Sequence, residues 1–202
     1  MAGIEHSMLI SLLQSSIAQG QTFYLTVSSD SMAPLLQAGD EVAVVARPPG
    51  RLRRGDIVVV DEESGLLTHR YWGKDGKGKL VTRGDRSLVF DPPWEPERLL
   101  GRVNARRRRG RTLSLERGAG AWLAAHLGRV AALEQRLFAG YAPTPLPAAP
   151  APTRLGNRLR QNGRYLPGRL LRRALHTWRA AIALPFAGTA GAGGTIRQDD
   201  AG

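Results

Sequence analysis

Two short segments carry the residue types that nucleophilic catalysis needs. Ser31 lies in the run Ser29-Asp30-Ser31-Met32-Ala33-Pro34, and a Gly39-Asp40 turn and a strand-like run follow it. A serine hydroxyl is a weak nucleophile, so it needs a neighbouring base and hydrogen-bond donors for the oxyanion that forms. His69 is the only histidine in the strand-rich region after Ser31, which makes it the candidate base.

A third group would have to orient the imidazole, and two carboxylates are available. Asp85 ends the run Thr82-Arg83-Gly84-Asp85, and Asp91 precedes Pro92. Both also fit ordinary turn positions, as Ser31 fits a turn or helix cap, so the residue types alone leave these roles open. The other histidines lack partners at ligand spacing, and we predict no metal site and no cofactor.

The elements that must position these residues are mostly strands. Many short runs rich in β-forming residues, separated by Gly-Asp and Pro/Gly turns, predict a small, mainly antiparallel β domain. Arg106–Arg109 before Gly110 predicts a hairpin with a solvated, arginine-rich tip. The predicted strands cover 23–27, 41–45, 56–60, 66–71, 79–82, 99–103 and 111–115.

Helical spacing of apolar residues predicts an N-terminal helix over 4–18 and C-terminal amphipathic helices over 119–138 and 167–184. Five prolines among alanines between Pro143 and Pro152 indicate a semi-rigid linker. The predicted organisation is an N-terminal helix (1–20), a catalytic β domain (21–115), an amphipathic helix (116–141), a Pro/Ala linker (142–153), a basic helical segment (154–187) and a disordered tail (188–202).

The net charge of +12 comes entirely from the second half of the chain. Residues 1–104 hold 12 Lys and Arg against 13 Asp and Glu, whereas residues 105–202 hold 17 Arg against 4 Asp and Glu. Such a basic segment predicts an anionic partner. The predicted helix over 167–184, with its arginines and Trp178, favours contact with an anionic membrane surface or with a protein. No recognition helix accompanies the arginines, so specific nucleic-acid binding is not predicted.

The chain has no cysteine, which excludes disulfides and thiol chemistry. No run of 18 apolar residues and no basic, apolar leader is evident at the N-terminus. We therefore expect a cytoplasmic or peripherally membrane-associated protein.

Over about residues 22–104 the chain resembles, in the order and spacing of several motifs, the signal peptidase I family and its clan, which includes LexA-type repressors. The resemblance implies a small antiparallel β domain of the signal peptidase/LexA-like type. The segments that carry it are Ser31-Met32-Ala33-Pro34 as the nucleophile motif, Gly39-Asp40 and Gly55-Asp56-Ile57-Val58 as the two following turns, Thr68-His69-Arg70 as the base motif, Thr82-Arg83-Gly84-Asp85 with Asp91 as the acidic motif, and Leu100-Gly101-Arg102-Val103 as the closing strand.

The His69-Arg70 pair resembles the branch of this family that uses histidine instead of lysine as base. The resemblance implies Ser31 as nucleophile, His69 as general base, and Asp91 as the orienting acid, with Asp85 as the fallback. It implies an oxyanion hole made by the Ser31 backbone N–H and the Ser29 hydroxyl.

Asp30 departs from the small residue usual between Ser29 and Ser31. Its charge would oppose an oxyanion unless the side chain points away. The resemblance also implies shallow substrate pockets for small side chains near Met32, Pro34, Phe23 and Leu25.

The implied function is that of a serine endopeptidase that removes a leader or signal segment from a protein or peptide. Two alternatives stay open. A LexA-like self-cleaving transcriptional regulator needs a DNA-binding domain, for which the twenty residues before the β domain are too few. A non-catalytic relative would bind peptides without cutting them.

Overall fold

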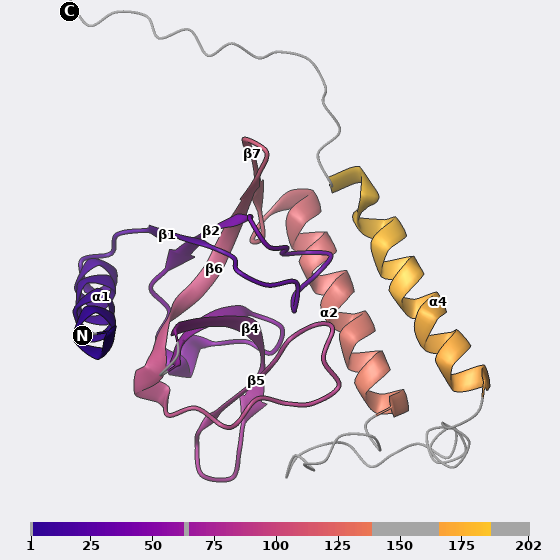
Figure 1. Ribbon diagram of the computed structural model, residues 1–202, viewed down its shortest axis with the longest axis horizontal. Coiled ribbons are helices and arrows are strands. Elements are labelled where there is room, and N and C mark those ends of the chain that lie inside the picture. The colour runs from indigo at the N-terminus through magenta and orange to yellow at the C-terminus, as the bar shows by residue number, and fades with distance from the viewer. Residues whose placement is uncertain (1, 63–64, 139–165, 187–202) are drawn as a thin grey trace, which may run out of the picture.

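The computed structural model describes residues 2–62, 65–138 and 166–186, and its centre is one curled antiparallel sheet of seven strands (Figure 1). The mainly antiparallel β fold with flanking helices is therefore confirmed. The elements are α1 (Ala2–Ala18), β1 (Phe23–Thr26), β2 (Glu41–Val45), η1 (Pro49–Arg51), β3 (Ile57–Glu62), β4 (Gly65–Lys74), β5 (Leu80–Arg83), η2 (Pro96–Arg98), β6 (Leu99–Arg108), β7 (Arg111–Ser114), α2 (Gly118–Phe138), α4 (Leu166–Ala183) and η4 (Leu184–Phe186).

The strand order is β1-β2-β6-β3-β4-β5, and β7 pairs with the far end of β6. The long strand β6 joins the two halves, because it pairs with β2 over one stretch and with β3 over another. Register shifts in the β2–β6, β3–β6 and β4–β5 pairings bend the sheet, as extra residues in a ladder do.

β3 is buried on both faces, which explains its continuous apolar run. Because strand side chains alternate in direction, Ile57 and Val59 enter the main core, whereas Val58 and Val60 enter a second core. Most of the main core comes from β2, β3 and β6, from the turn after β1, and from Leu123 and Leu127 of α2.

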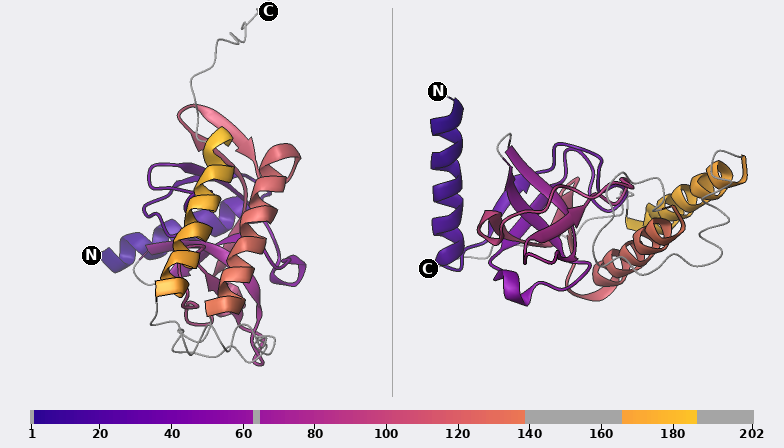
Figure 2. Two further views of the ribbon diagram at one scale, coloured as in Figure 1. Left: turned by 90° about the vertical axis from the view of Figure 1, so that its right-hand side faces the viewer. Right: turned by 90° about the horizontal axis from the view of Figure 1, so that it is seen from below.

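The helices lie at opposite ends of the sheet (Figure 2). Ile10 of α1 is buried in the main core, and Leu13 and Ile17 pack against it. The other side of α1 leaves Met8 and Leu12 exposed. None of the helices within the described residues is long and apolar enough to cross a membrane.

The arginine-rich hairpin differs from the solvated tip that we predicted. Arg106 is 4% exposed and donates hydrogen bonds to the carbonyl oxygens of Leu35 and Phe186. Arg108 forms a two-pronged ion pair with Asp40. These arginines continue β6 instead of forming its turn, and backbone carbonyls and a carboxylate compensate for their burial. Only Arg109 and Gly110 turn the chain into β7.

The helix α4 buries part of the surface that we predicted to contact an anionic membrane or a protein. Figure 2 shows α4 lying beside α2, and the two helices contact each other. Arg179, one of the arginines of this helix, is 1% exposed and donates to Glu134 of α2, whereas Trp178 is 44% exposed. A buried carboxylate needs a cation, so the Glu134 side chain determines which face of α4 turns inward.

The predicted linker over 142–153, the start of the basic segment up to residue 165 and the tail over 188–202 lie outside the described residues.

Candidate active site

Three side chains that are distant in the sequence form one hydrogen-bonded row. The Ser31 hydroxyl lies 2.9 Å from Nε2 of His69, and Nδ1 of His69 lies 2.7 Å from Oδ2 of Asp91. Ser31 begins the turn that follows β1, His69 belongs to β4, and Asp91 follows the loop after β5. His69 is 7% exposed, so the imidazole lies in a largely dry environment.

Asp91 is itself held by two residues that the sequence analysis did not assign to the site. The Thr82 hydroxyl donates to Oδ2 of Asp91 at 2.6 Å and accepts the indole N–H of Trp94 at 2.9 Å. The Asp91 backbone N–H also bonds to the Thr82 carbonyl at 3.0 Å. Thr82 is part of the segment that carries the family resemblance. No spacing in the sequence could associate Trp94 with the site, because this contact forms only when the chain after Asp91 folds back along β5.

Two hydrogen-bond donors, the Ser29 hydroxyl and the Ser31 backbone N–H, lie next to the Ser31 hydroxyl. The Ser29 hydroxyl donates to Oγ of Ser31 at 3.2 Å. The Ser31 backbone N–H has no hydrogen-bond partner among the described residues. Asp30 points away from this position, since its Oδ1 accepts the backbone N–H of Ala38 at 3.0 Å. The charge of Asp30 is therefore used to close the turn rather than to oppose an oxyanion.

Gly84 lies in close contact with the Ser31–His69 pair. A Cβ atom at this position would lie 2.9 Å from Nε2 of His69, 3.1 Å from the Ser31 carbonyl oxygen and 3.2 Å from the Ser31 Cβ. The carbonyl of Ser31 accepts the backbone N–H of Arg86 at 2.9 Å, which fixes this approach. Residue 84 must therefore be a glycine, because any side chain there would collide with Ser31 and His69.

Asp85, the fallback acid, has a different partner. Both of its carboxylate oxygens accept hydrogen bonds from the Arg70 guanidinium at 2.6 Å, and both side chains are almost completely buried. Arg70 also donates to the carbonyls of Gly55 and, at 3.4 Å, Ala124. In this structure Asp91, and not the fallback acid Asp85, contacts His69. The Asp85 carboxylate joins the loop after β5 to β4 and α2.

Arg83 ties the same loop to α2 from the other side. Its guanidinium donates to the carbonyls of Ser87 at 2.6 Å and Ala131 at 2.8 Å, and lies 4.7 Å from the Trp72 ring centre and 5.4 Å from that of Phe90. Burial lowers the pKa of the Arg83 guanidinium to about 10. The group still carries its charge at neutral pH, so the loop between Gly84 and Asp91 is held by a cation.

A small cavity of about 100 Å³ opens beside Ser31. Its walls come from the end of β1 with the residues that follow it, including Leu25 and Ser29, and from Leu66–Thr68 of β4. Within the described residues, both β1 and this part of β4 pair with other strands on one side only, which leaves two strand edges next to the cavity.

The other predicted substrate-binding residues lie differently. Met32 is 1% exposed and belongs to the main core, so it supports the turn of Ser31 from within. Phe23 packs against the same core, and neither Phe23 nor the half-buried Pro34 lines the small cavity. Of the predicted pocket residues, Leu25 is the one that contributes to its wall.

A comparison with protein families gives a result that agrees with this geometry. Residues 3–85 match the family model described as Peptidase S24-like. This segment of the chain is therefore similar to the signal peptidase I and LexA-like serine peptidase family. The S24-like segment contains Ser31 and His69 and ends before Asp91. No curated protein matches the chain.

The resemblance predicted from the sequence motifs is therefore confirmed over residues 3–85, and it points to a serine peptidase in general. Chemically, a serine hydroxyl bonded to an imidazole whose other nitrogen meets a carboxylate is suited to move a proton from oxygen to nitrogen during acyl transfer.

Proposed function

We propose that this protein is a serine endopeptidase of the histidine-base branch, with Ser31 as nucleophile, His69 as general base and Asp91 as the orienting acid. The observation that carries the proposal is the hydrogen-bonded row of these three side chains, at 2.9 Å and 2.7 Å. The family match supports the coarser class, a serine peptidase, independently of that geometry.

In the proposed reaction the Ser31 oxygen attacks a peptide carbonyl carbon while its proton moves to Nε2 of His69. The oxyanion that forms accepts hydrogen bonds from the Ser31 backbone N–H and the Ser29 hydroxyl. The C–N bond then breaks, and His69 gives the proton to the departing amine. A water molecule loses a proton to His69, attacks the acyl group and releases the acid, and the proton returns to Ser31.

Asp91 acts by holding His69 in one tautomer. Its Oδ2 accepts the Nδ1–H, so the lone pair of the imidazole is on Nε2, facing Ser31. The Thr82 hydroxyl, donating at 2.6 Å, fixes the carboxylate in that position.

The substrate would be an extended segment that adds its backbone to the free edges of β1 and β4. The cavity of about 100 Å³ next to Ser31 has room for a small side chain only. These features favour a leader or signal segment with a small residue before the cleaved bond, as the family resemblance implies.

The test is covalent labelling with a fluorophosphonate, which reacts with an activated serine. We expect one adduct, on Ser31, located by tandem mass spectrometry. Labelling should fall at least about a thousandfold in Ser31→Ala and in His69→Ala, in line with the loss of either member of such a pair. Ser11→Ala, which alters an exposed serine of α1, is the control and should label at the wild-type rate. An adduct elsewhere, or unchanged labelling of His69→Ala, would contradict the assignment.

The same preparation separates the alternatives. A self-cleaving regulator would yield two fragments on incubation without any added peptide, and Ser31→Ala would prevent their formation. A non-catalytic relative would bind peptides with no adduct at Ser31.

Contact with an anionic membrane is a proposal about the partner. The exposed Trp178 and the exposed Arg173 of α4 support it, although Arg179 is buried against α2. Co-sedimentation of the protein with vesicles of anionic lipid, compared with neutral vesicles, measures this membrane contact.

A further inference from the structure

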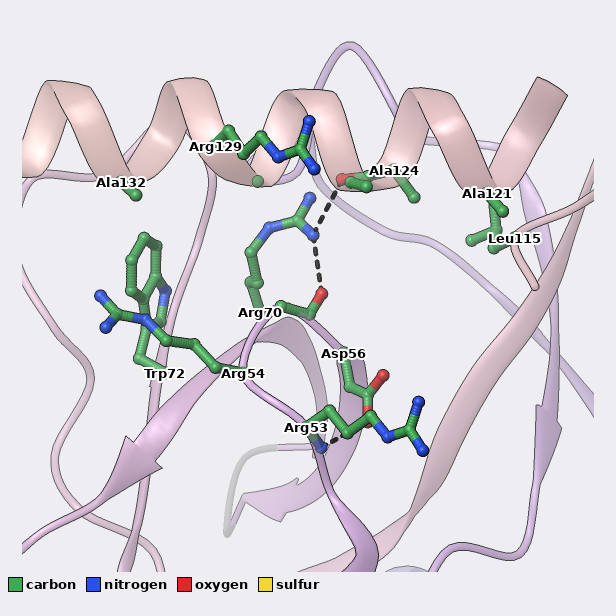
Figure 3. A pocket seen from close by; sticks show the side chains of 13 residues that line it. Arg53, Arg54, Asp56, Arg70, Trp72, Leu115, Ala121, Ala124, Arg129 and Ala132 are labelled. Carbon is green, nitrogen blue, oxygen red and sulfur yellow. Dashed lines mark hydrogen bonds between the residues drawn. The ribbon is translucent and has the colours of Figure 1, made fainter. Parts of the chain in front are cut away.

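A second, larger cavity of about 420 Å³ lies between α2 and the residues around β4, away from the Ser31 cavity (Figure 3). We call it the α2 cavity. Arg70 and Trp72 of β4 line it, whereas His69, between Ser31 and Asp91, does not. Adjacent residues of a strand point to opposite faces, so the α2 cavity is behind the candidate active site.

The α2 cavity carries an excess of positive charge. Arg53 and Arg54 reach it from the turn before β3, and Arg129 reaches it from α2 (Figure 3). None of these three guanidiniums has a carboxylate partner among the described residues. The one carboxylate in the lining, Asp56, accepts the backbone N–H of Arg53 at 2.8 Å. Three cations around one concave space attract anions.

A buried donor without a partner points to the same space. Trp72 is 8% exposed, and its indole N–H has no hydrogen-bond partner in the described part of the chain. An unpaired buried donor is unfavourable, so an acceptor oxygen placed here would gain a full hydrogen bond. Figure 3 shows the Trp72 indole at one end of the cavity, with the Arg54 guanidinium beside it.

Small side chains keep the α2 cavity open. The wall that α2 supplies consists of alanines and Gly128 besides Arg129, so no bulky group fills the space. A Cβ atom at Gly128 would already lie 3.2 Å from Nη1 of Arg70. The volume falls within the range of about 300–1,000 Å³ for small-molecule sites and exceeds what a lone ion needs.

We propose that the α2 cavity binds a small organic molecule that carries a phosphate group. A phosphate dianion offers three oxygens, enough for the Trp72 indole N–H, the Arg54 guanidinium beside it and a further cation of the lining, whereas a carboxylate offers two. The alanine wall would contact the rest of the molecule. This site is separate from the proposed peptidase function, because none of its lining residues belongs to the row of Ser31, His69 and Asp91.

The experiment follows the indole N–H signals of the ¹⁵N-labelled protein by NMR, with the Trp72 signal assigned from a Trp72→Phe variant. The probes are inorganic phosphate and adenosine 5′-monophosphate, titrated at constant ionic strength set with chloride. We expect a saturable shift of the Trp72 signal with at least one of them. Tighter binding of the nucleotide supports an organic phosphate as ligand, whereas equal binding of the two probes would overturn the organic part of the proposal.

Two variants test the residues. Arg53→Gln/Arg54→Gln/Arg129→Gln should weaken binding at least about tenfold, because it removes the charge-assisted hydrogen bonds. The control Arg109→Gln/Arg117→Gln/Arg173→Gln removes the same charge from exposed sites and should bind like the wild type.

Ala125→Leu narrows the cavity without changing charge or helix propensity greatly, and should also weaken binding. A Trp72 signal that does not move, or equal weakening in both arginine triple variants, would overturn the proposal. Binding of wild-type strength in Ala125→Leu would do so as well.

Discussion

Replacing Gly84 by alanine tests whether the spacing of Ser31 and His69 limits the reaction. The new methyl group would lie 2.9 Å from Nε2 of His69, about 0.5 Å closer than an ordinary van der Waals contact of roughly 3.4 Å allows. The backbone conformation of Gly84 is open to any residue, since its φ is not positive, so the change introduces this collision and no backbone strain.

The expected loss of rate follows from the lengthening of the hydrogen bond between Ser31 and His69. A displacement of about 0.5 Å away from Ser31 would lengthen the 2.9 Å contact to about 3.4 Å, beyond the usual limit of about 3.2 Å. Misplacement of this size lowers the rate of a positioned reaction by about 10- to 100-fold. The cost in stability is that of one methyl group in a packed site, about 1–3 kcal/mol.

The assay is the rate of fluorophosphonate labelling of Ser31 under conditions in which thermal denaturation shows the variant fully folded. Gly76→Ala is the matched control, because Gly76 is exposed and a Cβ there would meet nothing within 4 Å. The control should label like the wild type. A Gly84→Ala protein that is folded and labels at the wild-type rate would refute the idea that this glycine keeps the pair in register.

Three further changes give distinguishable results. Thr82→Val removes the hydroxyl that donates to Asp91, and Ser31 labelling should fall about tenfold, as expected for a lost hydrogen bond to a charged group of roughly 1.5 kcal/mol; unchanged labelling would show that the hydroxyl is dispensable. Asp85→Asn leaves Arg70 as a buried cation with one neutral partner, so urea denaturation should show a loss of about 3–5 kcal/mol. Burial lowers the pKa of His176 below its ordinary 6.5. The unfolded chain therefore binds the proton at a higher pH than the folded protein, and the free energy of unfolding decreases as pH falls through 6.5. His176→Gln should reduce this slope between pH 7.5 and 5.5, and an identical slope would count against it.

Much of the fold followed from local sequence patterns. Short runs rich in β-forming residues between Gly-Asp and Pro/Gly turns predicted the strand positions to within a few residues, and Gly39 and Gly55 do adopt the positive φ angles that such turns need. Ser31 and His69 were selected by residue type and motif order, and the structure brings them together.

Long-range packing was not predictable in this way. Arg106 and Arg179 looked like surface residues, because nothing near them in the chain reveals the carbonyls of Leu35 and Phe186 or the carboxylate of Glu134 that receive them. For the same reason, the sequence could not decide whether Asp85 or Asp91 contacts His69. It depends on the buried Arg70, which takes both oxygens of Asp85 and leaves Asp91 for His69.

The attachment of α2 to the strands has a consequence for dissecting the molecule. Arg70, next to His69 in the sequence, donates to the carbonyl of Ala124, and Arg83, next to Gly84, donates to the carbonyl of Ala131. Leu123 and Leu127 of the same helix are buried in the main core. A fragment cut after Leu115 would leave Arg83 without one of its acceptors and a large apolar surface in water. The smallest autonomous folding unit therefore extends through α2, and a truncation that respects only the borders of the sheet would yield an insoluble product.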